Sequence, residues 1–327
     1  MKIFFYIPEK YLPSDDWIEA WNEHQLIPLE EIGFATMHAW IYQTWALLNE
    51  AGVDCDLTDT LPREGIFIAL RGSLPSSFGT DAPLPENLFF VDIVADGFPH
   101  PAAQLHLVQN KAHTRLLPRS LFVPHWTQPC LMPRDAKRGH RFEKICFFGD
   151  SENLEPTLRT EAWHQRLKEE LDITFEIRGA EEWHDYSDVD GVIAIRSFSS
   201  SHQLHKPATK LYNAWQAGVP FIGGNDSAYK ADGNPGKNYL IATSAEDVFG
   251  HLKKLKEDER FRVDLVNQGV LSGKKFTREA TLEHWKKLVQ ETIPLQAREW
   301  QQKSQIERSF FVLTQRLICF LDRSLRA

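Results

Sequence analysis

The sequence predicts an α/β protein of two domains, each built on a parallel sheet. Short apolar runs alternate with helical patterns along most of the 327 residues, an order typical of parallel α/β sheets. The runs are apolar throughout, which indicates sheets covered on both faces. The length exceeds that of a usual single domain, so we expect two.

We expect the first domain at residues 1–128. Its apolar runs predict strands at 3–7, 66–70, 88–94, 105–108 and 121–123. Residues 35–51 carry an apolar stripe at helical spacing and are followed by Gly52, which predicts a helix that ends there. Prolines, a glycine and basic residues break the pattern at 124–139, as expected of a linker between domains.

The second domain is expected at 140–290. Strands are predicted at 145–148, 173–177, 191–195, 219–222 and 239–242, and helices at 160–171 and 245–256. Residues 291–327 are expected to form helices. Near the end of this segment apolar side chains lie among arginines, namely Phe310, Leu313, Leu317, Phe320 and Leu321. Such a helix either packs back on the first domain or lies on a membrane surface.

Composition excludes several classes of protein. The formal net charge of −8 argues against nucleic-acid binding, which needs a basic surface. The four cysteines show no CxxC spacing, so neither a zinc site nor a disulfide framework is expected. No signal peptide or membrane-spanning run is visible. We therefore expect a cytoplasmic protein, with peripheral membrane contact through the C-terminal helix as a variant of that expectation.

Residues 205–224 carry the strongest functional signal. Pro207 suits the first position of a helix, and Gly218 suits a left-handed C-terminal cap. Lys206 and Lys210 lie at the positive end of the helix dipole, where cations are disfavoured by about 0.3–1 kcal/mol each. Free backbone N–H groups and two ammonium groups together suit an anion such as phosphate. The alternative is a surface helix with solvated lysines.

Three predicted strands of the second domain are followed by residues suited to a ligand. Gly149 opens a turn after the first, which permits close backbone approach or is a simple turn. Arg196 follows another strand and either pairs with Asp188 or Asp190 or holds a phosphate. Gly224 follows a third, ahead of a polar loop. Ligands of open α/β sheets bind at this edge, so the residues together indicate a diphosphate site.

Residues 206–224 resemble the donor-binding segment of glycosyltransferases with the GT-B fold. There a lysine-rich helix start precedes an A-x-x-AG-V-P-x-I-x-G turn, matched here from Ala214 to Gly223. The resemblance covers about residues 140–290. It implies two Rossmann-like domains facing a cleft, a nucleotide-sugar donor in the second and an acceptor in the first. It also implies Lys206, Thr209 and Lys210 as diphosphate ligands, with no obligatory metal.

One departure from the family pattern concerns the mechanism. Many retaining members carry a Glu-x7-Glu pair, and the alignment places His205 and Asn213 at those positions. Neither is acidic, so ribose recognition by a carboxylate is not expected here. Asn213 can exchange hydrogen bonds with sugar or ribose hydroxyls. His205 either contacts the donor or is a core or capping histidine.

An inverting enzyme needs a base near the acceptor hydroxyl. The candidates are Asp96, His38 and Glu31, for which a turn aspartate, an amphipathic-face histidine and a capping acid are the structural alternatives. Gln109 and Asn110 are candidates for the acceptor side.

The function predicted from these features is transfer of a hexosyl or deoxyhexosyl group from a UDP-, GDP- or ADP-sugar. The acceptor is expected to be a glycan, a lipid or a small molecule. Two alternatives stay open: a nucleotide-sugar epimerase of the same fold, and a protein that binds a nucleotide sugar without catalysis.

Overall fold

The structure is a computed structural model that describes residues 1–12, 36–75, 77–79, 84–199 and 203–326. It divides into two compact units. Unit 1 comprises Met1–His125, Leu204–Pro207 and Glu279–Ala327, and unit 2 comprises Trp126–Gln203 and Ala208–Arg278. Thus residues 126–139 group with unit 2, and the segment around Lys206 groups with unit 1.

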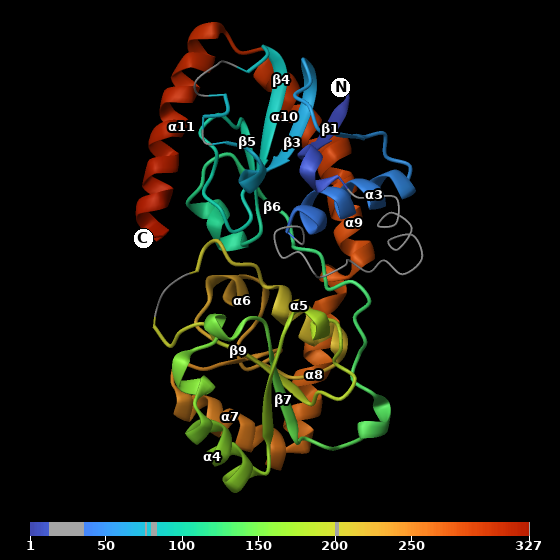
Figure 1. Cartoon of the computed structure of the whole chain (residues 1–327), viewed down its shortest axis with the longest axis vertical. Helices are drawn as coiled ribbons and strands as arrows, with labels where there is room; N and C mark the ends of the chain where they lie inside the picture. Colours follow the sequence, from blue (N-terminus) through green and yellow to red (C-terminus); the bar gives the residue numbers. More distant parts are fainter. Residues whose placement is uncertain (13–35, 76, 80–83, 200–202, 327) are drawn as a thin grey trace. The chain divides into compact units, whose positions relative to one another are not determined.

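Unit 1 contains a parallel sheet of strand order β2-β1-β3-β4-β5-β6 (Figure 1). Its strands are β1 (Ile3–Tyr6), β2 (Asp56–Thr58), β3 (Glu64–Leu70), β4 (Asn87–Ile93), β5 (Leu105–Val108) and β6 (Ser120–Phe122). The central strands β3 and β4 are buried except at their first residues. The sequence signal for β2 was absent because this strand is short, polar and only half buried.

The helices of unit 1 come from both ends of the chain. A π-helical turn (His38–Tyr42) leads into α3 (Gln43–Glu50). At the C-terminal end follow α9 (Arg278–Lys287), a π-helical turn (Leu288–Thr292), α10 (Ile293–Gln301) and α11 (Gln305–Arg326). Both α9 and α10 pack on the sheet: Trp285 of α9 contacts Phe5 of β1 at 6.2 Å between ring centres, and α10 packs on β3 and β4.

Unit 2 contains a second parallel sheet, of order β11-β10-β9-β7-β8. Its strands are β7 (Lys144–Phe148), β8 (Thr174–Arg178), β9 (Gly191–Ala194), β10 (Phe221–Gly223) and β11 (Leu240–Ile241). Its helices are α4 (Glu161–Leu171), α5 (Thr209–Ala217), α6 (Ser227–Asp232), α7 (Ala245–Glu257) and α8 (Glu259–Gly273). The prediction of two α/β units with parallel, buried sheets is confirmed.

Both faces of the unit 2 sheet are covered. Ile145 and Phe147 of β7 belong to a core that includes Leu167 of α4 and Leu252 of α7. The next residue of β7, Phe148, points to the other face, where it stacks on Tyr186 at 4.1 Å between ring centres. Successive side chains of a strand alternate between faces, so an unbroken apolar run buries both.

Short 3-10 helices lie at Glu9–Tyr11, Arg71–Ser73, Lys111–Arg115, Ala136–Arg138, Ser151–Asn153, Pro156–Arg159, Ala180–Glu182 and Lys274–Phe276. None of the helices among the described residues combines the length and the apolar character that crossing a membrane requires.

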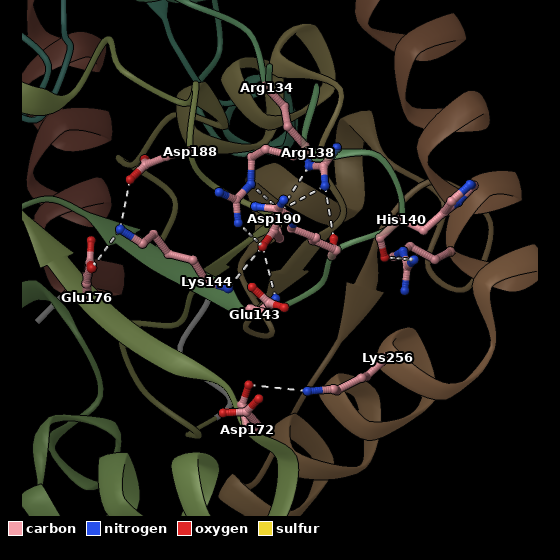
Figure 2. A network of polar contacts seen from close by, with 12 residues as sticks. Arg134, Arg138, His140, Glu143, Lys144, Asp172, Glu176, Asp188, Asp190 and Lys256 are labelled. Atoms are coloured by element: carbon pink, nitrogen blue, oxygen red, sulfur yellow. Dashed lines mark hydrogen bonds and ion pairs between the residues drawn. The ribbon is translucent and has the colours of Figure 1, made fainter. Parts of the chain in front are cut away.

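The amino edge of the unit 2 sheet is held by one buried carboxylate, Asp190 (Figure 2). Its two oxygens accept hydrogen bonds from Arg134 and Arg138, four in all at 2.7 to 3.0 Å. The backbone N–H groups of Glu143 and Lys144 donate to it as well, at 2.9 and 3.0 Å. Asp190 therefore fixes the segment that leads into β7 to the start of β9.

Candidate functional site

The carboxyl edge of the unit 2 sheet gathers residues that follow three adjacent strands. In this parallel sheet β10, β9 and β7 are neighbours, and they end at Gly223, Ala194 and Phe148. Gly149, Arg196 and Gly224 come within two residues of those ends. Because parallel strands end at the same edge, these three residues lie on one side of the sheet, the side where ligands bind in such folds.

Gly149 occupies a position that disfavours any other residue. Its φ of +148° is rarely adopted by L side chains, and a Cβ there would lie 3.1 Å from the Phe147 ring and 3.4 Å from Nζ of Lys210. Lys210 also lies over the Phe147 ring, 5.5 Å from its centre. The ammonium group of α5 is thus beside the bare backbone that follows β7.

Arg196 pairs with Asp226, and not with the partners that the sequence suggested. Its Nη1 donates to Oδ2 of Asp226 at 2.7 Å. Asp188 instead accepts from Lys144 and Arg178. The reason is position: Asp188 and Asp190 precede β9, whereas Arg196 follows it, so a strand of about 3.3 Å per residue separates them.

Cations and carboxylates both lie at this edge. Burial raises the pKa of Asp226, and the cations Arg196, Lys210 and Lys230 oppose that rise. Two further carboxylates lie nearby: Asp150 follows Gly149 and is exposed, and Glu155 accepts from the backbone N–H of Phe198 at 3.1 Å. An anion such as a diphosphate would interact favourably with the three cations.

Helix α5 directs its amino end to the same edge. Its cap residue, Ala208, has no side chain that could accept from the N–H groups of the first turn. Thr209 and Lys210 form that turn, so a positive side chain and the positive end of the dipole coincide. The helix begins two residues after Pro207, later than expected, and ends as predicted at Gly218, with φ +71°.

The packing of α5 fixes it rigidly. Tyr212 stacks on Phe276 at 3.9 Å between ring centres and donates from its hydroxyl to Asp232 at 2.5 Å. Trp215 donates from its indole N–H to the carbonyl of Asn238 at 2.8 Å. A Cβ on Gly269 would lie 2.6 Å from the Trp215 ring, so α8 approaches closely only through glycine. The amino end of α5 is held by these contacts.

Two other predicted ligand residues of α5, Asn213 and Thr209, have buried polar atoms. Asn213 is 5% exposed, and its Oδ1 accepts from the backbone N–H of Gln128 at 3.1 Å. It thereby ties the start of unit 2 to α5. Oγ1 of Thr209 is buried and has no hydrogen-bond partner among the described residues. A role for either residue at a ligand stays a prediction.

A second polar cluster lies in unit 1, at the carboxyl ends of β4 and β5. Lys206 donates to Oδ2 of Asp96 at 3.0 Å. Nε2 of Gln109 donates to Oδ1 of Asp96 at 2.8 Å and to the carbonyl of His205 at 2.7 Å. Lys206 and His205 therefore belong with the candidate base Asp96 in unit 1, whereas Lys210 belongs to unit 2. Each oxygen of Asp96 already accepts a hydrogen bond.

The other two candidate bases differ from Asp96. His38 is buried in a helical turn, and this burial lowers its pKa to about 3. It is a weak proton acceptor at neutral pH, since a general base works best with a pKa near the working pH. Glu31 lies outside the described residues.

Asp226 was not singled out from the sequence. It was expected only as part of a flexible polar loop, because an aspartate after two glycines is a common turn residue. The signal that could have found it is its place three residues after a buried strand, at the edge where cations were also predicted. Its partner Arg196 lies 30 residues earlier in the chain.

No protein-family model and no curated protein matches this chain. Solved structures do resemble it. HepE of Anabaena, in complex with UDP and glucose, is 10% identical with a TM-score of 0.50, and the match covers 90% of this chain and 99% of HepE. AviGT4, a glycosyltransferase involved in avilamycin A biosynthesis, is 12% identical with a TM-score of 0.49 over 80% and 89% of the two chains.

TarM is 13% identical with a TM-score of 0.48, and the match covers 75% of this chain. The chain spans 57% of the length of TarM and 60% of that of the pneumococcal O-GlcNAc transferase GtfA. Of these likenesses, the one to HepE reaches a TM-score of 0.50 over nearly the whole of both chains. It agrees with the two parallel α/β sheets described above. The chain therefore has the fold of the GT-B glycosyltransferases, with two Rossmann-like domains.

Proposed function

We propose that the protein is a glycosyltransferase that moves a sugar from a nucleotide-diphosphate-sugar to a hydroxyl acceptor, with the donor bound by unit 2. The observation that carries this proposal is the carboxyl edge of β7, β9 and β10. There Lys210 lies beside the bare backbone of Gly149, and Arg196 follows the neighbouring strand β9. The likeness to HepE, whose structure holds UDP and glucose, supports the fold on which the proposal rests.

The proposed chemistry follows from where charge develops. When the bond between sugar and diphosphate breaks, the leaving diphosphate gains negative charge. Lys210, Arg196 and the amino end of α5 are held in place before the reaction, so they stabilise that charge without rearranging. A uridine diphosphate hexose is the first donor to test; guanosine and adenosine diphosphate sugars follow.

The acceptor needs a base to take its hydroxyl proton. Asp96 is the candidate we favour, because it lies at the carboxyl edge of the unit 1 sheet and is exposed. Gln109 and Lys206 hold both of its oxygens and so fix its orientation. The acceptor itself is proposed as a hydroxyl of a glycan, a lipid or a small molecule.

A second candidate function is binding of a nucleotide sugar without transfer. Two observations favour it: both oxygens of Asp96 are engaged, and burial depresses the pKa of His38 to about 3. His38 is therefore a weak base, and an acceptor hydroxyl would have to share the Asp96 oxygens with Gln109 and Lys206.

Calorimetric titration with UDP, GDP and ADP tests the donor site. We expect one nucleotide to bind, and Lys210→Ala to weaken it by about tenfold or more, the loss expected for a charge-assisted contact to phosphate. Lys253→Ala is the matched control, because Lys253 belongs to the same unit and pairs on α7 with Glu257 at 3.9 Å. Equal affinities of the two variants would refute the phosphate assignment.

Release of nucleotide from a panel of nucleotide sugars then separates the two functions. Turnover with any acceptor supports transfer. Tight binding of a nucleotide sugar, with no turnover in the presence of any acceptor tested, would identify a binding protein.

A further inference from the structure

Helix α11 attaches to unit 1 through one of its faces (Figure 1). Phe311 contacts Trp300 edge to face at 4.8 Å, and Ile318 packs on a small core of unit 1. Asp322 pairs with Nε2 of His113 at 2.6 Å. Gln315, between them, is 1% exposed. These four residues recur at intervals of four and three, which defines one side of a helix.

The opposite side of α11 is apolar and exposed. Leu313 and Gln315 are two residues apart, which places them about 200° from one another around the axis. The side chains of this second side are between 51% and 82% exposed. We call them the outer stripe: Ile306, Phe310, Leu313, Leu317, Phe320 and Leu321. A contiguous exposed apolar surface of this kind marks an interaction site.

The charges beside the outer stripe are mostly positive. Arg316 and Arg323 are exposed on one flank. The pairing of His113 with Asp322 brings the 3-10 helix Lys111–Arg115 against the end of α11, and its Lys111 and Arg115 are exposed too. Among the described residues of α11, the exposed acid is Glu307, which is engaged at the other end by Ser304.

This charge pattern disfavours a second copy of α11 as the partner. The main seam of the stripe follows the four–three spacing of a helix pair, in which Arg316 and Arg323 occupy flanking positions. In an antiparallel pair these arginines would face the same arginines of the other copy. In a parallel pair Arg316 would face Leu321. Neither arrangement places an arginine of one copy beside an acid of the other. An anionic surface, in contrast, offers negative charge to both Arg316 and Arg323.

A pocket of unit 1 beside α11 has the same mixed character. It has a volume of about 620 Å³ and combines apolar side chains such as Trp300 and Val312 with Glu86, Arg308 and Arg316. Glu86 lies 3.5 Å from Arg308 and offsets its charge. Arg316 belongs both to the pocket lining and to the flank of the stripe, and an arginine beside apolar walls suits a negatively charged amphiphile.

We propose that the outer stripe of α11 binds the surface of an anionic lipid bilayer, with its apolar side chains below the headgroups and Arg316 and Arg323 among them. Helices with an apolar face of Phe and Leu and basic flanks lie in this way at membrane interfaces. This proposal is independent of the donor site, since it concerns other residues and is measured without nucleotide.

Vesicle flotation of the full chain tests it. We expect the protein to float with phosphatidylcholine vesicles that contain phosphatidylglycerol, and to float about tenfold less with phosphatidylcholine alone. High salt should release it, because the attraction of the arginines is screened. Replacing Arg316 and Arg323 by Gln should weaken binding to the anionic vesicles about fivefold for each arginine.

The variant Leu313→Ser/Leu317→Ser/Phe320→Ser should lose flotation by about tenfold or more. Its control, Leu271→Ser/Leu295→Ser, replaces exposed apolar residues of α8 and α10 and should float like the unchanged protein. Thermal unfolding checks that both variants fold, which we expect because every replaced side chain is exposed.

Two results would overturn the proposal. One is a protein that stays with neither kind of vesicle. The other is a dimer in sedimentation equilibrium that dissociates in the triple-serine variant while the unchanged protein ignores vesicles, which would assign the stripe to a second copy.

Discussion

Arg196 donates a hydrogen bond to Asp226 over 2.7 Å and so joins the residues that follow β9 and β10. Asp226 as a whole is 4% exposed. Burial raises its pKa, and Arg196, Lys210 and Lys230 only partly oppose this. The pair therefore places a costly negative charge inside a cluster that we assign to an anion.

Asp226→Asn should strengthen binding of the nucleoside diphosphate. The substitution removes the anion that competes for Arg196 and with it one negative charge, so we expect a dissociation constant about fivefold lower. Calorimetric titration measures this, with Asp264→Asn on exposed α8 as the control. Weaker binding would show instead that Asp226 is needed to orient Arg196.

Gly149→Ala should lower both stability and nucleotide affinity. Alanine at φ +148° is strained, and its Cβ would press on the Phe147 ring and on Lys210. We expect a loss of about 1–3 kcal/mol in the free energy of unfolding. Gly179→Ala is the matched control, since nothing lies within 4 Å of its Cβ position. Urea denaturation compares the two, and equal losses would contradict the special role of Gly149.

Asp190→Asn should destabilise unit 2 strongly. It removes the charge that holds Arg134 and Arg138, and breaking a buried pair in this way costs about 3–5 kcal/mol. The proposed nucleotide site lies at the other edge of the sheet, so affinity in the folded fraction should stay unchanged. Urea denaturation measures the loss, again against Asp264→Asn.

The same carboxylate predicts a dependence of stability on pH. Burial alone would raise the pKa of Asp190, but hydrogen bonds from Arg138 and from the N–H groups of Glu143 and Lys144 outweigh it and hold the pKa below its usual value. In the unfolded chain an aspartate has a pKa of about 3.9. Because the pKa of Asp190 is lower in the folded state, its charge stabilises the fold fully above the unfolded value, and this contribution is lost as pH falls through the folded value. Unfolding at pH 7 and at pH 3 should therefore show a smaller acid loss in Asp190→Asn than in the unchanged protein. Equal acid losses would contradict this assignment.

Asp96→Asn should abolish transfer and spare nucleotide binding. If Asp96 takes the proton of the acceptor, its loss lowers kcat by about 10²–10⁴-fold. Asp54→Asn, an exposed change in the same unit, should leave kcat as it is. His38→Gln should reduce stability without moving the pH profile, because His38 is buried. Full activity of Asp96→Asn would exclude it as the base.

The sequence predicted the parts of the site that depend on local pattern. Unbroken apolar runs predicted the strands of unit 2, and Gly218 and Pro220 predicted where α5 ends. Gly149, Arg196 and Lys210 were expected at one edge, and the structure brings them to that edge of unit 2. Each of these inferences needs only the residues next to it in the chain.

The contacts that the sequence missed join distant residues. Lys206 was grouped with Lys210 because both were placed at the start of one helix. The helix begins later, at Thr209, and Lys206 instead pairs with Asp96, 110 residues away in the chain. For α11, the helical pattern gave an apolar side and basic residues. It could not show that Phe311, Gln315, Ile318 and Asp322 make the attachment.

The Asp190 network lies at the amino edge of the unit 2 sheet, where β7 and β9 begin, and the proposed ligand site lies where they end. The residues of the Asp190 network and those of the proposed ligand site therefore flank the same strands but do not contact one another. Side chains after β7, β9 and β10 can be exchanged without disturbing the network. Ligand preference in this unit is thus free to diverge, or to be redesigned, on an unchanged scaffold.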